Sequence, residues 1–576
     1  SIGHSPISGL IDSKKGSINS ISEALTNIIW APLKDGLKSV SLSANWMWPS
    51  GKSGEDSRLY DAVESCSDFA IELGINIPTG KDSLSMVQKY DDTNEVKSPG
   101  TVIISASAHC SDIRKVVTPN LKGSEGIIYY INLSKDDYKL GGSSFSQINN
   151  KIGNDAPTII DSKSFKKTFN LIQNLIKEEK ILSGHDISSG GLITSLFEMC
   201  FTDNNLGMDI DLTALNEQDI VKVLFAENSG IIFQSKSKLN EFFEKEQISF
   251  HEIGKVVKSD SLNIKNNNDN YSFNVSDYRD IWFSTSYHFD KIQTKNNLAE
   301  KRFENYKIQP LEFAFPKKFT GKILKNRNKI NAAIIREKGS NSEREMAYMM
   351  SLSGFNVKDV HMTDIISGRE NLENINLLVA VGGFSNSDVL GSAKGWAGSF
   401  IYNDKAKQTL NNFFNRDDSL SLGVCNGCQL FIELGLINND HDIKPKMGHN
   451  DSGKFECIFT SVKIQKSPSI MMKGMEGSNL GIWAAHGEGK FIFPYDESKY
   501  IIPAKYSYDE YPANPNGSDY NAAMLTSNDG RHLVIMPHLE RSIYPHNWAY
   551  YPNNREDEVS PWIIAFDNAY SWLNNK

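Results

Sequence analysis

A cysteine flanked by glycines is the residue whose surroundings could support the most reactive chemistry. Cys425, at the centre of the pattern G-x-C-x-G, directly follows the apolar run Leu420–Val424. A sharp strand-to-helix turn exposes a nucleophile, and a helix N-terminus favours the thiolate form of a cysteine. The backbone amide of Asn426 and a second amide from the turn at 382–384 would then face an oxyanion. The pattern predicts covalent catalysis with Cys425 as the nucleophile.

A histidine and a carboxylate near the C-terminal end could activate this thiol. His538 and Glu540 lie two residues apart in the segment 536–541. Side chains at this spacing point the same way from an extended backbone. A cysteine nucleophile needs a base, and the base needs a group that orients it. We therefore expect His538 to shuttle the proton and Glu540 to fix its tautomer.

Two alternatives compete with this assignment. Cys425 and Cys428 form a C-x-x-C pair, which is also typical of zinc knuckles and redox sites. Zinc would need a second pair of ligands, and Cys457 is the one other cysteine nearby in the sequence; a redox pair would need a thioredoxin-like setting. His486 is a rival base, or a loop histidine near the substrate. The strand pattern before Cys425 and the His-x-Glu sequence after it favour the catalytic interpretation.

The second half of the chain alternates strand and helix patterns that would hold these residues together. Such alternation predicts a parallel, doubly wound sheet, in which chemistry lies beyond the carboxyl ends of the strands. Cys425, His538 and the turn at 382–384 all fall at such ends. The expected strands are 329–335, 377–381, Leu420–Val424 and 533–536, with helices over Glu343–Leu352 and after Cys425.

The first half mixes strand and helix signals. An Asn-rich stretch at 263–270 predicts a loop, and Pro310 and Pro316 predict a linker before the second half. The other expected elements are helices at 20–30 and 192–200 and strands at 102–108 and 126–131.

Bulk composition limits the classes of function. The 576 residues suggest three or four domains, and a net charge of −9 argues against general nucleic-acid binding. The sequence contains no apolar run long enough to span a bilayer and no signal peptide, so we expect no membrane partner. Six cysteines are too few for a disulfide scaffold, which predicts a cytoplasmic location. Because the chain opens with Ser1, we expect a processed chain or a piece of a longer one.

Several longer segments make the chain resemble one known family. This family is phosphoribosylformylglycinamidine synthase in its large single-chain form, and the similarity runs nearly end to end in the family's order. The resemblance implies an α/β and α+β multidomain fold, with an aminoimidazole-ribonucleotide-synthetase-like α+β half before a doubly wound class I glutaminase domain. The segments that carry it are 382–384, 423–429, 486–489 and 511–517, and in the first half 23–27, 43–47, 54–56, 80–86 and 185–191.

The resemblance also implies a reaction and its partners. Formylglycinamide ribonucleotide, ATP and glutamine would become formylglycinamidine ribonucleotide, ADP, phosphate and glutamate, as a step of purine synthesis. The glutaminase would release ammonia, which displaces phosphate from an ATP-activated amide. The chain looks like the second synthase half plus the glutaminase, so the expected partner is the missing N-terminal portion of the same enzyme. The expected parts are 1–120 and 121–290 (two synthase subdomains), 291–325 (linker) and 326–576 (glutaminase).

The family pattern assigns a metal site in the first half. It makes Glu23, Asn27 and Asp186 ligands of Mg²⁺ and makes Ser188 a nucleotide contact, at a site that holds a structural, auxiliary ADP in this family. Glu23 and Asn27 are four apart and share a helix face, and their oxygens suit Mg²⁺. The alternatives are that Glu23 completes a capping box with Ser20, and that Asp186 forms an Asx-turn or a helix cap.

The chain departs from the family pattern at several places around the expected glutamine site. Leu539 stands where the family usually has Pro, and Ser385–Asp388 replaces a segment that usually has an aromatic residue and a Gly. His449 and Lys454 stand where arginines are common. These departures bear on glutamine affinity and loop geometry, and they leave the triad intact.

Two other functions fit parts of the sequence. A free-standing thiol hydrolase would use the C-terminal domain alone, and labelling of Cys425 by glutamine analogues without peptide cleavage would argue against it. A nucleotide-binding scaffold with a decayed site is the non-enzyme alternative. The intact Cys425, His538 and Glu540 argue against a decayed site.

Overall fold

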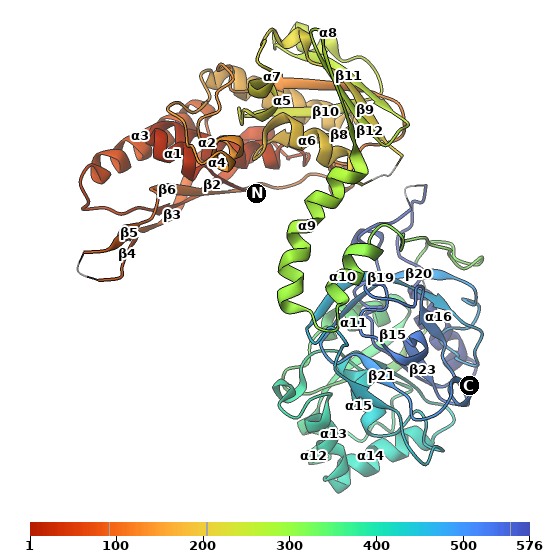
Figure 1. Ribbon diagram of the computed structural model, residues 1–576. Coiled ribbons are helices and arrows are strands. Elements are labelled where there is room, and N and C mark those ends of the chain that lie inside the picture. Colours follow the sequence, from red (N-terminus) through yellow and green to blue (C-terminus); the bar gives the residue numbers. More distant parts are fainter. Residues whose placement is uncertain (92, 203–204, 326, 553) are drawn as a thin grey trace. The chain divides into compact units, whose positions relative to one another are not determined.

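The computed structural model describes residues 1–91, 93–202, 205–325, 327–552 and 554–576. Within these residues the chain forms two compact units, Ser1–Trp282 and Phe283–Lys576 (Figure 1). Each unit buries apolar clusters of its own. No described helix is both long and apolar enough to cross a membrane.

The first unit opens with a small mixed sheet and its helices. The strand order is β1-β6-β2-β3, with β6 antiparallel to β1 and β2, and β2 parallel to β3. Helix α2 packs on α3, β1 and β6. It begins at Ser13 because the Asp12 side chain accepts hydrogen bonds from the backbone amides of Lys14 and Lys15. The elements are β1 (Ile2–His4), α1 (Pro6–Ile11), α2 (Ser13–Ile28), β2 (Ser41–Met47), α3 (Glu55–Leu73), β3 (Asn76–Ser83), β6 (Thr101–Ser107) and the ribbon β4 (Val87–Lys89) with β5 (Glu95–Lys97).

A second sheet completes the first unit. Its strand order is β13-β12-β9-β11-β7-β10-β8, and its neighbours are antiparallel except for β9 and β12. The elements are β7 (Ile127–Asn132), α4 (Ser144–Ile148), α5 (Ser162–Lys177), β8 (Ile181–Ile187), α6 (Gly191–Cys200), β9 (Gly207–Asp211), α7 (Ile220–Phe225), β10 (Gly230–Ser235), α8 (Asn240–Lys245), β11 (His251–Val257), β12 (Ser261–Asn266) and β13 (Asp269–Asn274).

The loop predicted at 263–270 is wrong, because this stretch is a β-hairpin of β12 and β13. Leu262 and Ile264 are buried, and their alternation with polar residues fits a strand with one face on the core. The hairpin turns at Asn267, whose φ of 53° lies in the left-handed region that Asn tolerates. Asn267 and Asn268 therefore mark the turn and Asn270 is exposed on β13, whereas Asn266 is buried at the end of β12.

The second unit contains a mainly parallel sheet. Its order is β15-β14-β16-β17-β24-β23, with parallel neighbours from β15 to β24 and antiparallel β23 at the edge. Every residue of β16, β17 and β24 is buried, as in sheets covered on both faces. Helices α11 and α16 pack on each other and on β14, whereas α13 packs on α14 and α15, and α15 packs on β16, β17 and β24. The predicted doubly wound sheet is confirmed. The elements are β14 (Ile330–Arg336), α11 (Glu343–Leu352), β15 (Phe355–His361), α12 (Met362–Ser367), β16 (Leu377–Ala380), α13 (Lys394–Ile401), α14 (Asp404–Asn415), β17 (Leu420–Val424), α15 (Asn426–Glu433), β23 (Met524–Thr526), β24 (His532–Ile535) and α16 (Ile563–Asn574).

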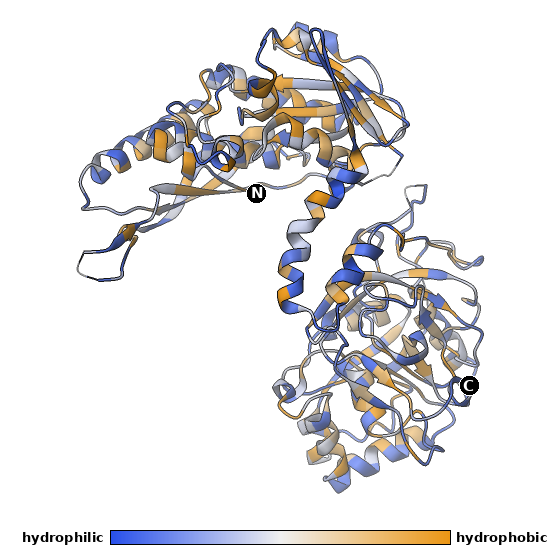
Figure 2. Ribbon diagram, viewed as in Figure 1, coloured by the Kyte–Doolittle hydropathy of each residue, from blue (hydrophilic) through white to orange (hydrophobic). Residues whose placement is uncertain are grey.

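Two further helices and two small sheets lie outside this parallel sheet. Helix α9 (Val275–Gln293) runs across the boundary between the units, and it carries hydrophilic and hydrophobic residues along its whole length (Figure 2). Helix α10 (Leu298–Asn305) lies inside the stretch predicted as a linker. The small sheets are β18 (Lys446–Gly448) with β21 (Lys490–Ile492), and β20 (Asn479–His486) with β19 (Glu456–Ile464) and β22 (Ala504–Tyr506).

Candidate active site

The residues predicted to be catalytic meet at one edge of the parallel sheet. Cys425 directly follows β17, Gly382 follows β16, and His538 follows β24. These strands run parallel, so their carboxyl ends lie at the same edge. A Cβ atom added to Gly382 would lie 2.8 Å from Cε1 of His538 and 3.5 Å from Cβ of Cys425. The structure thus brings the thiol and the imidazole against the same glycine.

Cys425 occupies a strained turn. Its φ of 51° and ψ of −105° are rare for a residue with a side chain, and such strain is often found at functional sites. A Cβ at Gly423 would lie 2.5 Å from the carbonyl oxygen of Gly427, and a Cβ at Gly427 would lie 2.0 Å from that of Ala380. Both glycines are therefore required by close backbone packing. Cys425 is 6% exposed, and its thiol donates to the carbonyl oxygen of Ala485 at 3.7 Å.

His538 and Glu540 form a buried pair. His538 Nδ1 and Glu540 Oε1 are 2.6 Å apart. Burial lowers the pKa of His538, but Glu540 and Cys425 outweigh it and raise this pKa to about 10. Burial raises the pKa of Glu540, but the charge on His538 outweighs this effect, so the pKa of the Glu540 carboxyl lies below its ordinary value. The backbone N–H of His538 donates to the carbonyl oxygen of Trp483 at 2.7 Å. The pair is held as an imidazolium and a carboxylate.

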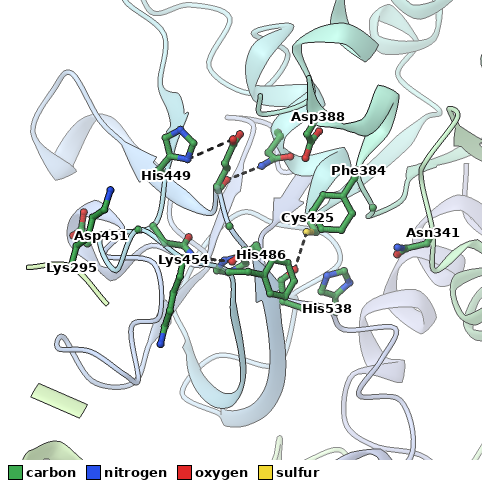
Figure 3. Close-up of a pocket in the computed structure, with 18 of the residues that line it drawn as sticks. Lys295, Asn341, Phe384, Asp388, Cys425, His449, Asp451, Lys454, His486 and His538 are labelled. Atoms are coloured by element: carbon green, nitrogen blue, oxygen red, sulfur yellow. Dashed lines mark hydrogen bonds and ion pairs between the residues drawn. The ribbon is translucent and has the colours of Figure 1, made fainter. Parts of the chain in front are cut away.

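A cavity of about 710 Å³ opens over Cys425. Figure 3 shows Cys425 and His538 at one side of it and Lys295, Asp451 and Lys454 at the other. Charged side chains of both signs line the cavity, which suits a ligand with an ammonium and a carboxylate group. Sequence reasoning did not select several of its lining residues, because no local pattern marks them; Lys295, Asn296, Asn341 and Asp451 are examples.

The metal and redox interpretations of the C-x-x-C pair find no support in the geometry. Cys428 lies inside α15 and is fully buried, and burial raises the pKa of its thiol well above the ordinary value. A thiol of this kind is a poor nucleophile and a poor metal ligand. Among the described residues, no three His, Cys, Asp or Glu side chains are placed to hold a metal.

His486 lies near the His538–Glu540 pair but differs from His538 in its surroundings. It is 2% exposed, and burial, with a further contribution from the charge on His538, lowers its pKa to about 3. Its Nε2 atom lies 3.5 Å from the side-chain nitrogen of Asn516, an amide rather than a carboxylate. His486 is therefore neutral at physiological pH, and the geometry favours His538 as the base.

The turn after β16 narrows the choice of oxyanion donors. The N–H of Phe384 donates to the carbonyl oxygen of Gly339 at 2.9 Å, so it is already engaged. Gly383 has a φ of 120°, and a Cβ there would lie 2.5 Å from Cα of Ser340. The side-chain oxygen of Asn426 accepts from the N–H of Ser385 at 3.1 Å, which ties this turn to the elbow. The amides of Gly383 and Asn426 are the candidates that remain.

In the first unit, two of the predicted residues line a cavity of about 530 Å³. The hydroxyl of Ser188 donates to Glu23 Oε1 at 2.5 Å. Burial raises the pKa of Glu23 to about 7 against this hydrogen bond, and the carboxylates of Asp186 and Glu227 add to the rise. Glu23 is thus a carboxyl whose charge is poorly compensated by the protein itself.

The capping alternatives for this site are wrong. Helix α2 begins at Ser13 with Asp12 as its cap, so Glu23 lies well inside the helix. Asp186 lies within β8, paired with Ile231, and the residue before α6 is Gly190, which makes no side-chain cap. Neither carboxylate is explained by local backbone needs.

The predicted Mg²⁺ ligands are only partly gathered. Asn27 lies one turn beyond Glu23 on α2 and is exposed. Asp186 Oδ1 lies 3.3 Å from Nδ1 of His185; burial lowers the pKa of His185, but Asp186 and a second carboxylate raise it to about 10. The structure places Ser188 on Glu23 with Asp186 nearby, but it adds no third His, Cys, Asp or Glu ligand within the described residues. The metal assignment stays a prediction.

Glu23→Gln should raise the stability of the ligand-free chain at pH 8. The folded pKa of about 7 exceeds the ordinary 4.5, so the folded state binds this proton more tightly and the free energy of unfolding falls as pH rises from about 4.5 to 7. Gln removes this loss, which is worth about 3 kcal/mol. Thermal unfolding in a chelator at pH 4 and pH 8 measures this difference, and the exposed Glu72→Gln, which should change the stability little, is the control.

Adding Mg-ADP should then stabilise Glu23→Gln less than wild type. Equal stabilisation of the two proteins would show that Glu23 is not one of the ligands.

Three family models match the chain. Residues 329–573 match the CobB/CobQ-like glutamine amidotransferase domain. Residues 1–109 match the FGAR-AT PurM_N-like domain, and residues 129–266 match the C-terminal domain of AIR synthase related proteins.

Curated relatives match along almost the whole chain. A probable phosphoribosylformylglycinamidine synthase of Arabidopsis thaliana is 40% identical over 99% of this chain and 43% of its own length. By sequence, the chain is similar to a part of the phosphoribosylformylglycinamidine synthases. The synthases of Dictyostelium discoideum and Homo sapiens are 37% and 35% identical, over 100% and 99% of this chain and 47% and 45% of their own lengths. The chain spans less than half the length of these relatives.

Solved structures resemble parts of the chain. "Structure of PurLQS from Thermotoga maritima" has a TM-score of 0.33 and 23% identity, and it covers 42% of this chain and 98% of that chain. "T. maritima PurL complexed with FGAR" has a TM-score of 0.39 and 14% identity, over 48% of this chain and 44% of that chain.

The departures from the synthase pattern leave the contact between His538 and Glu540 intact, and three of them, Asp388, His449 and Lys454, line the cavity. Leu539 is fully buried, and the contact between its neighbours His538 and Glu540 is intact. In the loop after Phe384, Asn386 and Ser387 adopt φ of 52° and 57°, a region that costs a residue with a Cβ on the order of 1 kcal/mol. The loop thus keeps a conformation that suits glycine, although this chain has none there.

Proposed function

We propose that the second unit is a glutaminase in which Cys425 is the nucleophile and His538 and Glu540 are its base and orienting group. The observation that supports it most is the buried His538–Glu540 pair placed against Gly382 beside Cys425. The glutamine amidotransferase match over 329–573 agrees with it. A cavity with charges of both signs suits an amino acid substrate.

The reaction follows from the positions of these groups. The Cys425 thiolate attacks the carboxamide carbon of glutamine, a C–S bond forms, and the carbonyl electron pair moves onto oxygen. The amides of Gly383 and Asn426 would stabilise that oxyanion. Collapse breaks the C–N bond, His538 supplies the proton, and ammonia leaves a γ-glutamyl thioester. His538 then takes a proton from water, which attacks the thioester and releases glutamate.

For the first unit we propose the synthase reaction that consumes this ammonia. Formylglycinamide ribonucleotide would be converted to formylglycinamidine ribonucleotide at the expense of ATP, as the names of the relatives and the matches over 1–109 and 129–266 suggest. The cavity of Glu23 and Ser188 is the place where we expect ADP to bind. If Mg²⁺ binds there, it would neutralise phosphate charge beside Glu23 and Asp186.

We also propose that this synthesis needs the remaining portion of such an enzyme, joined or as a separate partner, because the chain spans less than half of its relatives. The purified chain should release glutamate from glutamine. With formylglycinamide ribonucleotide, Mg-ATP and ammonium, it should form the amidine only when the N-terminal portion of a related synthase is added.

Ammonium bypasses the glutaminase, so the two activities fail separately. Sustained amidine formation by the chain alone would contradict the need for a partner. A folded chain that releases no glutamate, alone or with the partner, would contradict the glutaminase assignment.

A further inference from the structure

The turn between α9 and α10 contributes to the wall of the catalytic cavity. Lys295 and Asn296, both in this turn, line the same cavity as Cys425 and His538. They precede the matched amidotransferase region, which begins at residue 329. Part of the cavity wall therefore comes from chain outside that region.

This turn makes hydrogen bonds to a loop that lies much further along the chain, residues 449–455. The backbone N–H of Lys295 donates to the carbonyl oxygen of Ser452 at 2.9 Å. The side-chain amide of Asn296 donates to the carbonyl oxygen of Asp451 at 2.7 Å. Both bonds hold the backbone of the loop.

An ion pair fastens the same loop to α9. The ammonium of Lys454 contacts the carboxylate of Asp290, which also accepts a hydrogen bond from the hydroxyl of Thr294 at 2.6 Å. Arg302 of α10 lies 3.2 Å from the second oxygen of Asp290. The Asp290 and Lys454 side chains are 10% and 20% exposed, so the pair is largely shielded from solvent.

Lys454 lies between two cavities. It lines the catalytic cavity, and it also lines a smaller cavity of about 370 Å³ beside α9 and α10. Arg302 reaches further, to the carboxylate of Glu456 at 2.8 Å, at the start of β19. Both the loop and the strand that follows it are thus tied to the hairpin.

The inner side of the loop is tied to the catalytic region. The side chain of Asn450 donates to the carbonyl oxygen of His486 at 2.7 Å, and it accepts from the N–H of Gly489 at 3.0 Å. The loop therefore connects the hairpin on its outer side to the end of β20 on its inner side. A shift of the hairpin would move the cavity wall opposite Cys425.

We propose that the α9–α10 hairpin is a positioning element of the glutamine site, which sets the affinity for glutamine by holding the loop 449–455 through the Asp290–Lys454 pair. This inference rests on the proposed glutaminase function. Cys425 and His538 follow strands of the central sheet, and neither depends on the hairpin for its place. Loosening the loop should therefore weaken substrate binding more than it slows the chemistry.

The test uses Lys454→Met and Asp290→Asn in the full chain. Lys454→Met leaves Asp290 paired with Arg302, and Asp290→Asn leaves Lys454 without its carboxylate. Either change frees the loop from α9, so the KM for glutamine should rise about tenfold while kcat changes less than about threefold. Lys454→Arg should keep KM near the wild-type value, because it keeps the charge. The double variant should be no worse than the worse single variant, because both remove the same interaction.

Lys291→Met is the matched control. Lys291 lies on the same hairpin and pairs with Glu300 at 3.6 Å, but both side chains are exposed. Its KM should not change. Thr294→Val, which removes one bond to Asp290, is the milder variant if Asp290→Asn fails to fold.

Hydrogen exchange over 449–455 provides a readout that does not need turnover. It should be faster in Lys454→Met and Asp290→Asn than in wild type, and unchanged in Lys291→Met. A wild-type chain that releases no glutamate would overturn the proposed function. Faster exchange over 449–455 in the two variants would still support the proposal that the Asp290–Lys454 pair holds this loop. Unchanged exchange and unchanged KM in both variants would overturn the inference.

Discussion

Cys425→Ala should abolish glutamine hydrolysis, with a loss of several orders of magnitude in rate. The variant keeps the cavity and the His538–Glu540 pair but has no atom that can form the thioester. Synthesis from ammonium by the assembled enzyme should persist, because free ammonia does not need the thiol. Glutamate release and ammonium-dependent amidine formation are measured side by side, and loss of both in a folded variant would contradict separate sites.

Cys428→Ala is the matched control for this variant. Cys428 lies three residues further along, fully buried in α15, and burial raises its pKa well above the ordinary value. Its loss should leave hydrolysis nearly intact; an equal loss would instead favour a C-x-x-C mechanism. A glutamine-derived electrophile should label wild type at Cys425 and leave Cys425→Ala unlabelled. Peptide cleavage by the wild type would revive the free-standing hydrolase.

Glu540→Gln should lower kcat for glutamine by about 10²–10⁴-fold. Glu540 accepts from His538 Nδ1 at 2.6 Å, and together with Cys425 it raises the pKa of His538 to about 10 despite burial. Gln has no negative charge to counter the effect of burial, so the pKa of His538 should fall in the variant. The imidazole then holds the proton needed for ammonia release less firmly.

The pH dependence checks the sign of this effect. Because the folded pKa of His538 is raised, its stabilising contribution is complete below about 6.5 and is lost as pH rises through 10. Because Glu540→Gln should lower the pKa of His538, the alkaline limb of the kcat profile should move to lower pH in this variant. The exposed Glu558→Gln, which lies on the surface beside Lys322, should keep the wild-type profile. An unshifted alkaline limb in Glu540→Gln would show that Glu540 does not control the protonation of His538.

The sequence by itself determined the features whose causes are local. Leu420–Val424 and Glu343–Leu352 have the predicted bounds, because an apolar run and a helical pattern each specify their own element. The elbow at Cys425 follows from two glycines that the turn requires. Composition alone failed at 263–270, because asparagines suit both a loop and the solvated face of a hairpin.

Only the tertiary structure decided which charged groups share a site. The sequence ranks His486 second to His538 as the base, and the structure gives the physical difference: His486 has an amide neighbour and a pKa of about 3, whereas His538 has a carboxylate neighbour and a pKa of about 10. Asp290 and Lys454 are 164 residues apart, and no local pattern could pair them. Burial and electrostatic partners depend on segments that meet through folding, so their effects on pKa and on the cavity wall cannot be read from neighbouring residues in the chain.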